Sequence, residues 1–239
     1  EKKEKGKVRQ DLLFGWNYLR ARRGLFGMLW YFAMVNFTLN FAGVLTGPLV
    51  LSAHPASAYG FVQTMLGAGL LSGGLLISAW GGPKTRRVPV LIGCIAVASL
   101  GLAIIGVNQH LAFPAAGFFI MMLCVPIASS LSQAVFQTKV APEAQGRVFA
   151  VRALISRSIM PLAYILSGLL ADHFFEPLMR EGGALVNTPL GTLVGVGAGR
   201  GIGLMFVIAG LAGILVSLLV YLNPRVRKLE EEIPDALAG

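Results

Sequence analysis

The chain alternates long apolar segments with short polar segments, and the apolar segments number six. Each is close to the ~20 residues with which an α-helix crosses the ~30 Å hydrocarbon core of a bilayer. These segments contain almost no charged residues, as expected for helices surrounded by lipid and by other apolar helices. The pattern predicts six transmembrane helices, at about residues 26–50, 59–80, 88–107, 113–137, 148–171 and 202–222.

Composition supports this class, because 55% of the residues are hydrophobic and only 13% are charged, far from the averages of soluble proteins. The net charge of +9 would also suit a nucleic-acid binder. The basic residues, however, lie in short clusters between apolar segments and form no single stripe. We therefore expect an all-α membrane protein with the lipid bilayer as a partner, and no nucleic acid.

The positions of lysine and arginine predict the orientation, since these residues collect in short cytoplasmic loops. Of 20 such residues, 17 fall in four segments: the first 25 residues, the loop after the second span, the loop after the fourth span with its helix start, and the C-terminal tail. The opposite side holds only Arg180 and Arg200, and Arg157 falls within the fifth span. Both termini are expected in the cytoplasm.

The two ends of the chain flank the bundle of spans. Residues 1–25 are a basic linker in which Val8, Leu12, Trp16 and Leu19 recur at helical spacing. This pattern is typical of an amphipathic helix on an anionic membrane surface, and a solvated linker is the alternative. Residues 223–239 are expected to form a cytoplasmic tail. Because the sequence starts at Glu1 without a methionine, we expect a fragment of a longer protein.

Polar residues within the spans indicate a cavity. Asn36 and Asn40 share one face of the first span, and Ser129, Gln133 and Gln137 follow at successive fours in the fourth span. With the aromatic residues Tyr31 and Phe37, these side chains suit an amphipathic small molecule. The alternative is that the amides only join helices by hydrogen bonds. Spans 88–107 and 202–222 have few polar residues, so they are expected to face lipid.

Arg157 lies about nine residues inside the fifth span, ~13 Å along a helix axis. An ionisable residue at this depth is costly and often functional. Either it extends to the interface or has a structural partner, or it pairs with an acid of another unit or with an anionic substrate. The spans contain no carboxylate or histidine for proton coupling, since Asp172 lies at the outer end of the fifth span. A coupling acid would have to lie outside this chain.

Enzymatic chemistry has little support. The sequence contains no HExxH motif and no CxxC pair, and its histidines, His54, His110 and His173, fall in loops. Cys94 and Cys124 lie in apolar segments, as small apolar side chains do. We expect no enzyme activity, metal or cofactor, and a proton gradient is one candidate energy source for transport.

Two loops resemble those of a known family: GGLLISAWGGPKTRR at residues 73–87 and KVAPEAQGRVFAVR at residues 139–152. Together they resemble the C-terminal half of major facilitator superfamily transporters, most closely the drug-exporter branch that contains macrolide-efflux and enterobactin-export proteins. In the first loop Gly82, Lys84, Arg86 and Arg87 match the glycine and basic positions of the family pattern. The usual acid is missing near Trp80 and Gly81. The resemblance of the second loop lies in Glu143, Gln145, Gly146 and Arg147, which implies gating contacts at both loops.

The resemblance implies that the chain is one six-helix half of a twelve-helix transporter in the cell membrane, with the N-terminal six-helix half as its partner. It implies secondary-active export of an amphipathic small molecule, such as a drug, a macrolide or a siderophore-like metabolite, by alternating access. The first and fourth spans would line the substrate cavity. The alternative is a six-span membrane scaffold or partner subunit that transports nothing itself.

Overall fold

The computed structural model describes residues 2–236, with side chains from Arg9 onward, so Val8 and the lysines before it lie outside the described side chains. In this part there are six helices long and apolar enough to cross a membrane. They are α2 (Arg23–Leu51), α3 (Ala56–Trp80), α4 (Arg87–Val107), α5 (Ala112–Lys139), α6 (Pro142–Leu170) and α9 (Arg200–Leu222). Each predicted span falls within one of them, except that 148–171 extends one residue into the π-helical turn η1 (Ala171–Phe175). The all-α class is confirmed for the described residues, which contain no strand.

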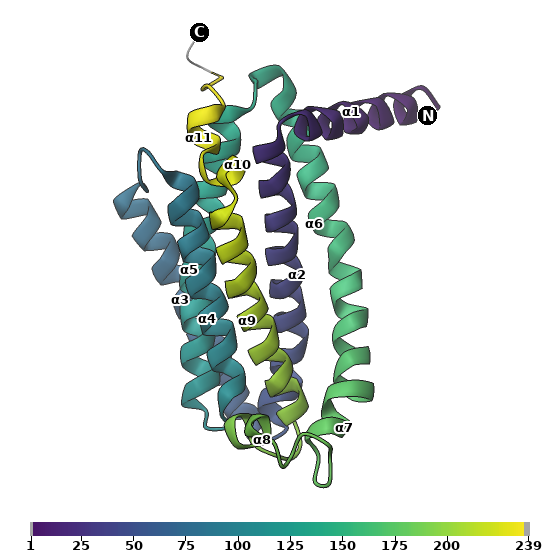
Figure 1. Cartoon of the computed structure of the whole chain (residues 1–239), viewed down its shortest axis with the longest axis vertical. Coiled ribbons are helices and arrows are strands. Elements are labelled where there is room, and N and C mark those ends of the chain that lie inside the picture. Colours follow the sequence, from purple (N-terminus) through teal and green to yellow (C-terminus); the bar gives the residue numbers. More distant parts are fainter. Residues whose placement is uncertain (1, 237–239) are drawn as a thin grey trace.

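The six long helices stand side by side in one bundle (Figure 1). Helix α4 packs against α5 and α9, α3 packs mainly against α5, and α6 packs mainly against α2. Two short helices, α7 (Glu176–Met179) and α8 (Pro189–Val194), lie at one end of the bundle, at the bottom of Figure 1. Helices α3 and α6 therefore lie at opposite margins of the bundle, each with one principal neighbour.

The first and last described helices lie at the other end of the bundle (Figure 1). There α1 (Lys2–Ala21) runs sideways from the start of α2 past α6 and projects from the bundle, and the short helices α10 (Pro224–Arg227) and α11 (Leu229–Glu232) follow α9. The α3–α4 and α5–α6 connections lie at this end too, so the described residues of all four lysine and arginine clusters lie at one end of the bundle. We call it the basic end.

Glycines allow the central helices to approach closely. A Cβ atom at Gly101 of α4 would lie 2.8 Å from the carbonyl oxygen of Gly117 in α5. A Cβ at Gly106 of α4 would collide with the carbonyl oxygen of Gly203 in α9. In lipid, where apolar surface gains little from leaving its solvent, such close backbone packing is a main source of helix association.

Helices α4 and α9, whose spans 88–107 and 202–222 were expected to face lipid, are the most buried of the six. Within their most apolar stretches, 50% of the residues of α4 and 44% of those of α9 are buried, against 17% for α3 and 11% for α6. Apolar side chains are equally at home against lipid and against another helix, so hydrophobicity alone could not separate the two. Only one side of α9, with Leu211, Leu215 and Leu218, is exposed.

The contact between α3 and α5 yields a prediction about stability. A Cβ at Gly73 would collide with the backbone carbonyl of Leu123, whereas a Cβ at Gly67 would meet nothing within 4 Å. We expect Gly73→Ala to lower the free energy of unfolding by about 1–3 kcal/mol, as overpacking does. Gly67→Ala should leave it unchanged or raise it by up to about 1 kcal/mol, since alanine favours helix. Thermal unfolding in detergent measures both, and equal effects would contradict this packing.

Candidate functional site

Helices α2, α4, α5 and α9 enclose a cavity of about 270 Å³ near the middle of the bundle. Its wall is mainly apolar, with side chains such as Phe32, Ile95, Leu102 and Val125. Of the seven predicted cavity residues, Tyr31, Asn36, Phe37 and Ser129 line it, whereas Asn40, Gln133 and Gln137 do not. Helices α4 and α9, which were not expected to contribute, provide eight of its 21 lining residues. As substrate contacts, all seven residues remain predictions.

The polar side chains of α2 are held by local hydrogen bonds. The Tyr31 hydroxyl lies 2.7 Å from the Ser217 hydroxyl and so joins α2 to α9. The Asn36 amide donates to the Phe32 carbonyl at 2.8 Å, and the Asn40 amide donates to the Asn36 carbonyl at 2.7 Å. Each asparagine uses an N–H group on its own helix, so its amide oxygen remains as an acceptor for a ligand.

Ser129, Gln133 and Gln137 form an exposed polar stripe along α5. The backbone of α5 at Leu123, on one side of this stripe, packs against Gly73 of α3. On the other side Ser132 is bonded to Arg152 of α6. By helix periodicity the stripe lies between these two contacts, on an open face bordered by α3 and α6. No other part of the described chain covers it.

Arg152 of α6 contacts side chains of α2 and α5. Its Nη2 atom donates to the Ser132 hydroxyl at 2.9 Å. The guanidinium carbon lies 4.0 Å from the ring centroid of Phe136, 5.5 Å from that of Phe149 and 5.8 Å from that of Phe32. These aromatic faces attract the cation. The Nη1 atom is buried without a hydrogen-bond partner in the described structure. Such a donor needs an acceptor, and the described part of the chain provides none.

Arg157, by contrast, is exposed in this chain and has no hydrogen bond or ion pair among the described residues. Its two alternatives therefore stay open. Sequence analysis considered Arg157 because it lies deep within the predicted span, and it grouped Arg152 with the basic residues of the preceding loop. The phenylalanine three residues before Arg152, a neighbour on the same helix face, was the available sequence signal.

The α3–α4 connection contains the first predicted gating group. Gly82 adopts a left-handed conformation with φ +74°, and Lys84 and Arg86 are exposed at the basic end. An acid from the C-terminal tail lies at the start of α4, just after this loop. The Glu230 carboxylate of α11 accepts a hydrogen bond from the Val88 N–H at 3.0 Å, at the first turn of α4. A carboxylate at this position is favoured by the helix dipole.

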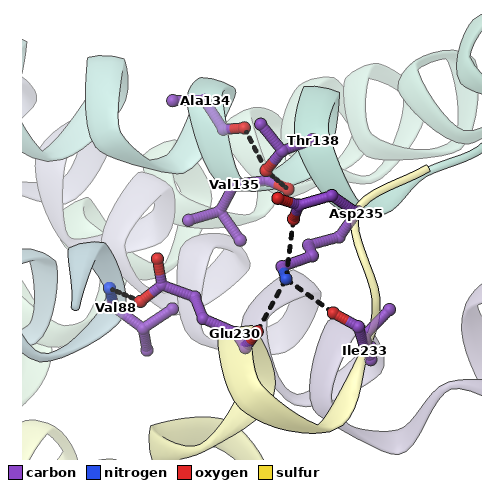
Figure 2. Close-up of polar contacts among 8 residues, drawn as sticks. Val88, Ala134, Val135, Thr138, Glu230, Ile233 and Asp235 are labelled. Carbon is purple, nitrogen blue, oxygen red and sulfur yellow. Dashed lines mark hydrogen bonds and ion pairs between the residues drawn. The ribbon is translucent and has the colours of Figure 1, made fainter. Parts of the chain in front are cut away.

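Lys139, at the end of α5, fastens the tail to the bundle (Figure 2). This lysine is only 7% exposed. Its ammonium group donates to the carbonyl oxygens of Glu230 and Ile233 at 2.7 and 2.5 Å, and pairs with the Asp235 carboxylate at 2.8 Å. The Ala236 N–H adds a bond of 2.8 Å to the Thr138 carbonyl. We call residues 229–236, held in this way, the tail latch.

The hydrogen bond and the charge of Lys139 lower the pKa of Asp235. A carboxyl group whose pKa is lowered by folding stabilises the folded form above its unfolded pKa, about 4, and loses this effect as the pH falls through the lowered value. The latch is therefore expected to remain closed throughout the neutral range.

The second predicted gating group lies under α1. The Arg147 Nε atom pairs with the Asp11 carboxylate at 2.9 Å, and the Tyr18 hydroxyl accepts from the Ala141 N–H at 3.1 Å. Gln145 donates to the carbonyls of Gln137 and Val140 at the end of α5, while Glu143 and Gly146 are exposed. Helix α1 thus contacts the α5–α6 turn through Asp11 and Tyr18.

The opposite end has a buried charged group that sequence analysis missed. The Glu176 carboxylate accepts from the N–H groups of Gly199 and Ile202 and so caps the start of α9. Arg200, only 2% exposed, donates to the Gly106 carbonyl of α4 at 2.5 Å. These contacts join the α7–α8 segment to α9 and α4. Sequence analysis had counted Arg200 as an ordinary loop cation.

The described residues contain no group of three or more His, Cys, Asp or Glu side chains that could bind a metal ion together. Cys94 and Cys124 are both free thiols.

Comparison with known proteins identifies relatives among drug-efflux proteins. The chain is 30% identical over 174 residues to macrolide efflux protein A of Streptococcus pyogenes, a match that covers 69% of this chain and 41% of that protein. It is 28% identical over 163 residues to macrolide efflux protein A of Enterococcus faecalis, covering 64% of this chain and 48% of that protein. The chain thus matches less than half the length of either relative. No family model and no solved structure matches it.

The tail latch yields a prediction about local dynamics. In a Lys139→Met variant the two tail carbonyls and Asp235 lose their shared donor. Hydrogen bonds to a charged group contribute about 1.5–3 kcal/mol. We expect amide hydrogen exchange in residues 229–236 to be faster by about tenfold or more, since 1.4 kcal/mol corresponds to a factor of ten.

Arg20→Met is the control, because Arg20 is exposed at the same end and has no hydrogen bond or ion pair among the described residues. It should leave exchange in the tail unchanged. Unchanged exchange in Lys139→Met, or equal acceleration in the two variants, would show that Lys139 does not hold the tail.

Proposed function

Because the chain is a homologue of macrolide efflux proteins and has six helices of membrane-spanning length, we propose that it is one half of a drug exporter of the major facilitator type. The observation that supports this most is the combination of sequence similarity with a mid-bundle cavity. The basic end, where the lysine and arginine clusters meet, is the cytoplasmic end in this proposal.

The substrate is an amphipathic small molecule, with a macrolide as the first candidate. The cavity offers a mainly apolar wall with hydrogen-bonding groups at Asn36, Thr38 and Ser129. The stripe of Ser129, Gln133 and Gln137 extends this polar surface onto the open face. Such a mixture of apolar area and few polar groups is typical of sites that bind small organic molecules.

A second six-helix unit covers the open face in the complete transporter. Helices α3 and α6 are the least buried of the six and border the exposed polar stripe of α5. In transporters built from two related halves, substrate binds near the membrane midplane between the halves. Rocking of one half against the other would then expose the stripe to each side of the membrane in turn.

Coupling to a proton gradient would depend on the second unit, since the described parts of α2, α3, α4, α5 and α9 contain no Asp or Glu. The buried Nη1 atom of Arg152, which has no partner, is the group of this chain best placed to meet a carboxylate. That carboxylate belongs to the second unit or to an anionic substrate. An intramembrane arginine with an incomplete hydrogen-bonding shell favours such a role.

Accumulation of a radiolabelled macrolide tests the proposal. The chain, with any coding sequence that flanks it, is expressed in a macrolide-susceptible bacterium. We expect cells to accumulate less macrolide than cells with an empty vector, and an uncoupler to abolish the difference. Equal accumulation, with the protein present in the membrane, would contradict export and favour a scaffold without transport.

Two arginines on one helix give a matched pair of variants. We expect Arg152→Gln to slow efflux by about tenfold or more, because a guanidinium bonded to Ser132 and enclosed by aromatic rings is lost. Arg157→Gln should keep efflux within about twofold, as is usual for an exposed side chain without partners. Efflux rates normalised to membrane protein measure both. Loss in Arg157→Gln with normal efflux in Arg152→Gln would assign the functional charge to Arg157 instead.

A further inference from the structure

A second cavity, of about 580 Å³, lies at the basic end between the α3–α4 connection, the end of α5 and the tail latch. We call it the basic pocket. Six cationic side chains line it: Lys84, Arg86, Arg87, Lys139, Arg227 and Lys228. Its volume falls within the range of sites that hold small molecules. It lies away from the mid-bundle cavity and shares no lining residue with it.

Positive charge in the basic pocket is only partly balanced. Of the three acids in its wall, Glu230 is bonded to the Val88 N–H and Asp235 is paired with Lys139, which leaves Glu231. The five cations other than Lys139 form no ion pair within residues 9–236, whose side chains are described. Several like charges held around one space favour an anion there.

Two of these cations are held in position. The Arg87 Nε atom donates to the Pro83 carbonyl at 3.3 Å, and the Arg227 guanidinium lies 5.5 Å from the ring centroid of Tyr221. Arg86 has φ +58°, the only positive φ at a non-glycine residue in the described chain. A left-handed conformation at such a residue is uncommon and often marks a functional position.

We propose that the basic pocket binds a phosphate group, as the head group of an anionic phospholipid or as inorganic phosphate. Guanidinium groups match the geometry of phosphate oxygens and bind them in pairs. The basic pocket also lies at the ends of membrane-spanning helices, with Tyr221 in its wall, where lipid head groups are found. Basic pockets at the cytoplasmic ends of such helices bind anionic lipid head groups. The bound phosphate would join the α3–α4 connection to the tail.

Thermal unfolding of the purified chain tests this site without any transport substrate. The chain is reconstituted in nanodiscs of phosphatidylcholine, with or without phosphatidylglycerol, and inorganic phosphate is titrated separately. The pocket variant is Arg87→Gln with Arg227→Gln. The control is Arg20→Gln with Arg23→Gln, which removes the same charge from exposed positions at the same end, outside the basic pocket.

We expect phosphatidylglycerol to raise the unfolding temperature of the wild type and the control, and the rise to be at least halved in the pocket variant. A rise with phosphatidylglycerol alone identifies a lipid head group, and an equal rise with inorganic phosphate identifies free phosphate. If the pocket variant does not fold, Lys84→Gln with Lys228→Gln replaces it, since both side chains are exposed.

Equal rises in the wild type and the pocket variant would overturn the proposal, because they would reflect general attraction to an anionic surface. The absence of any rise with either anion would overturn it as well. Neither result bears on macrolide accumulation, so failure of this site and failure of the proposed transport function remain distinguishable.

Discussion

In the hydrocarbon of a membrane, a charged or hydrogen-bonding group has no water to bind, so it needs a partner within the protein. This constraint determines where the polar groups of the bundle lie. Within the bundle, Tyr31 is bonded to Ser217 and Arg152 to Ser132. At the two ends, where burial also excludes water, Lys139 is bonded to three oxygen atoms of the tail and Glu176 to two backbone N–H groups of α9. The groups that lack partners in the described chain are therefore informative about what binds there.

Two such features point to the same conclusion from different places in the bundle. The Nη1 atom of Arg152 is buried without a partner, and the polar stripe that includes Gln133 lies uncovered between α3 and α6. A second six-helix unit with a substrate between the halves would satisfy both. At the basic end, α1 and the tail latch hold the α5–α6 turn and the α3–α4 connection, the two loops at which gating contacts were expected. The ends are fastened, while the face between α3 and α6 is open.

Much of the fold was predictable, because length and hydrophobicity suffice to place membrane helices, and basic clusters suffice to group the loops at one end. Packing was not predictable from hydrophobicity, since lipid and protein are equally apolar surroundings for α4 and α9. Glycines such as Gly101 and Gly106, which permit close contact between helices, could have indicated that α4 is packed against its neighbours. The partners of Lys139 were out of reach for another reason: they lie about ninety residues away, beyond any local pattern.

Accessibility of the open face to water tests the central claim most directly, namely that the polar stripe of α5 faces a substrate path. Single cysteines replace Gln133 and, as a lipid-facing control, Leu215 of α9, in a chain whose Cys94 and Cys124 are serine. Membrane vesicles are treated with a membrane-impermeant thiol reagent. The account predicts labelling at position 133, slowed by an added macrolide, and little labelling at position 215. Equal protection of both positions, regardless of macrolide, would place the stripe against lipid and contradict the account.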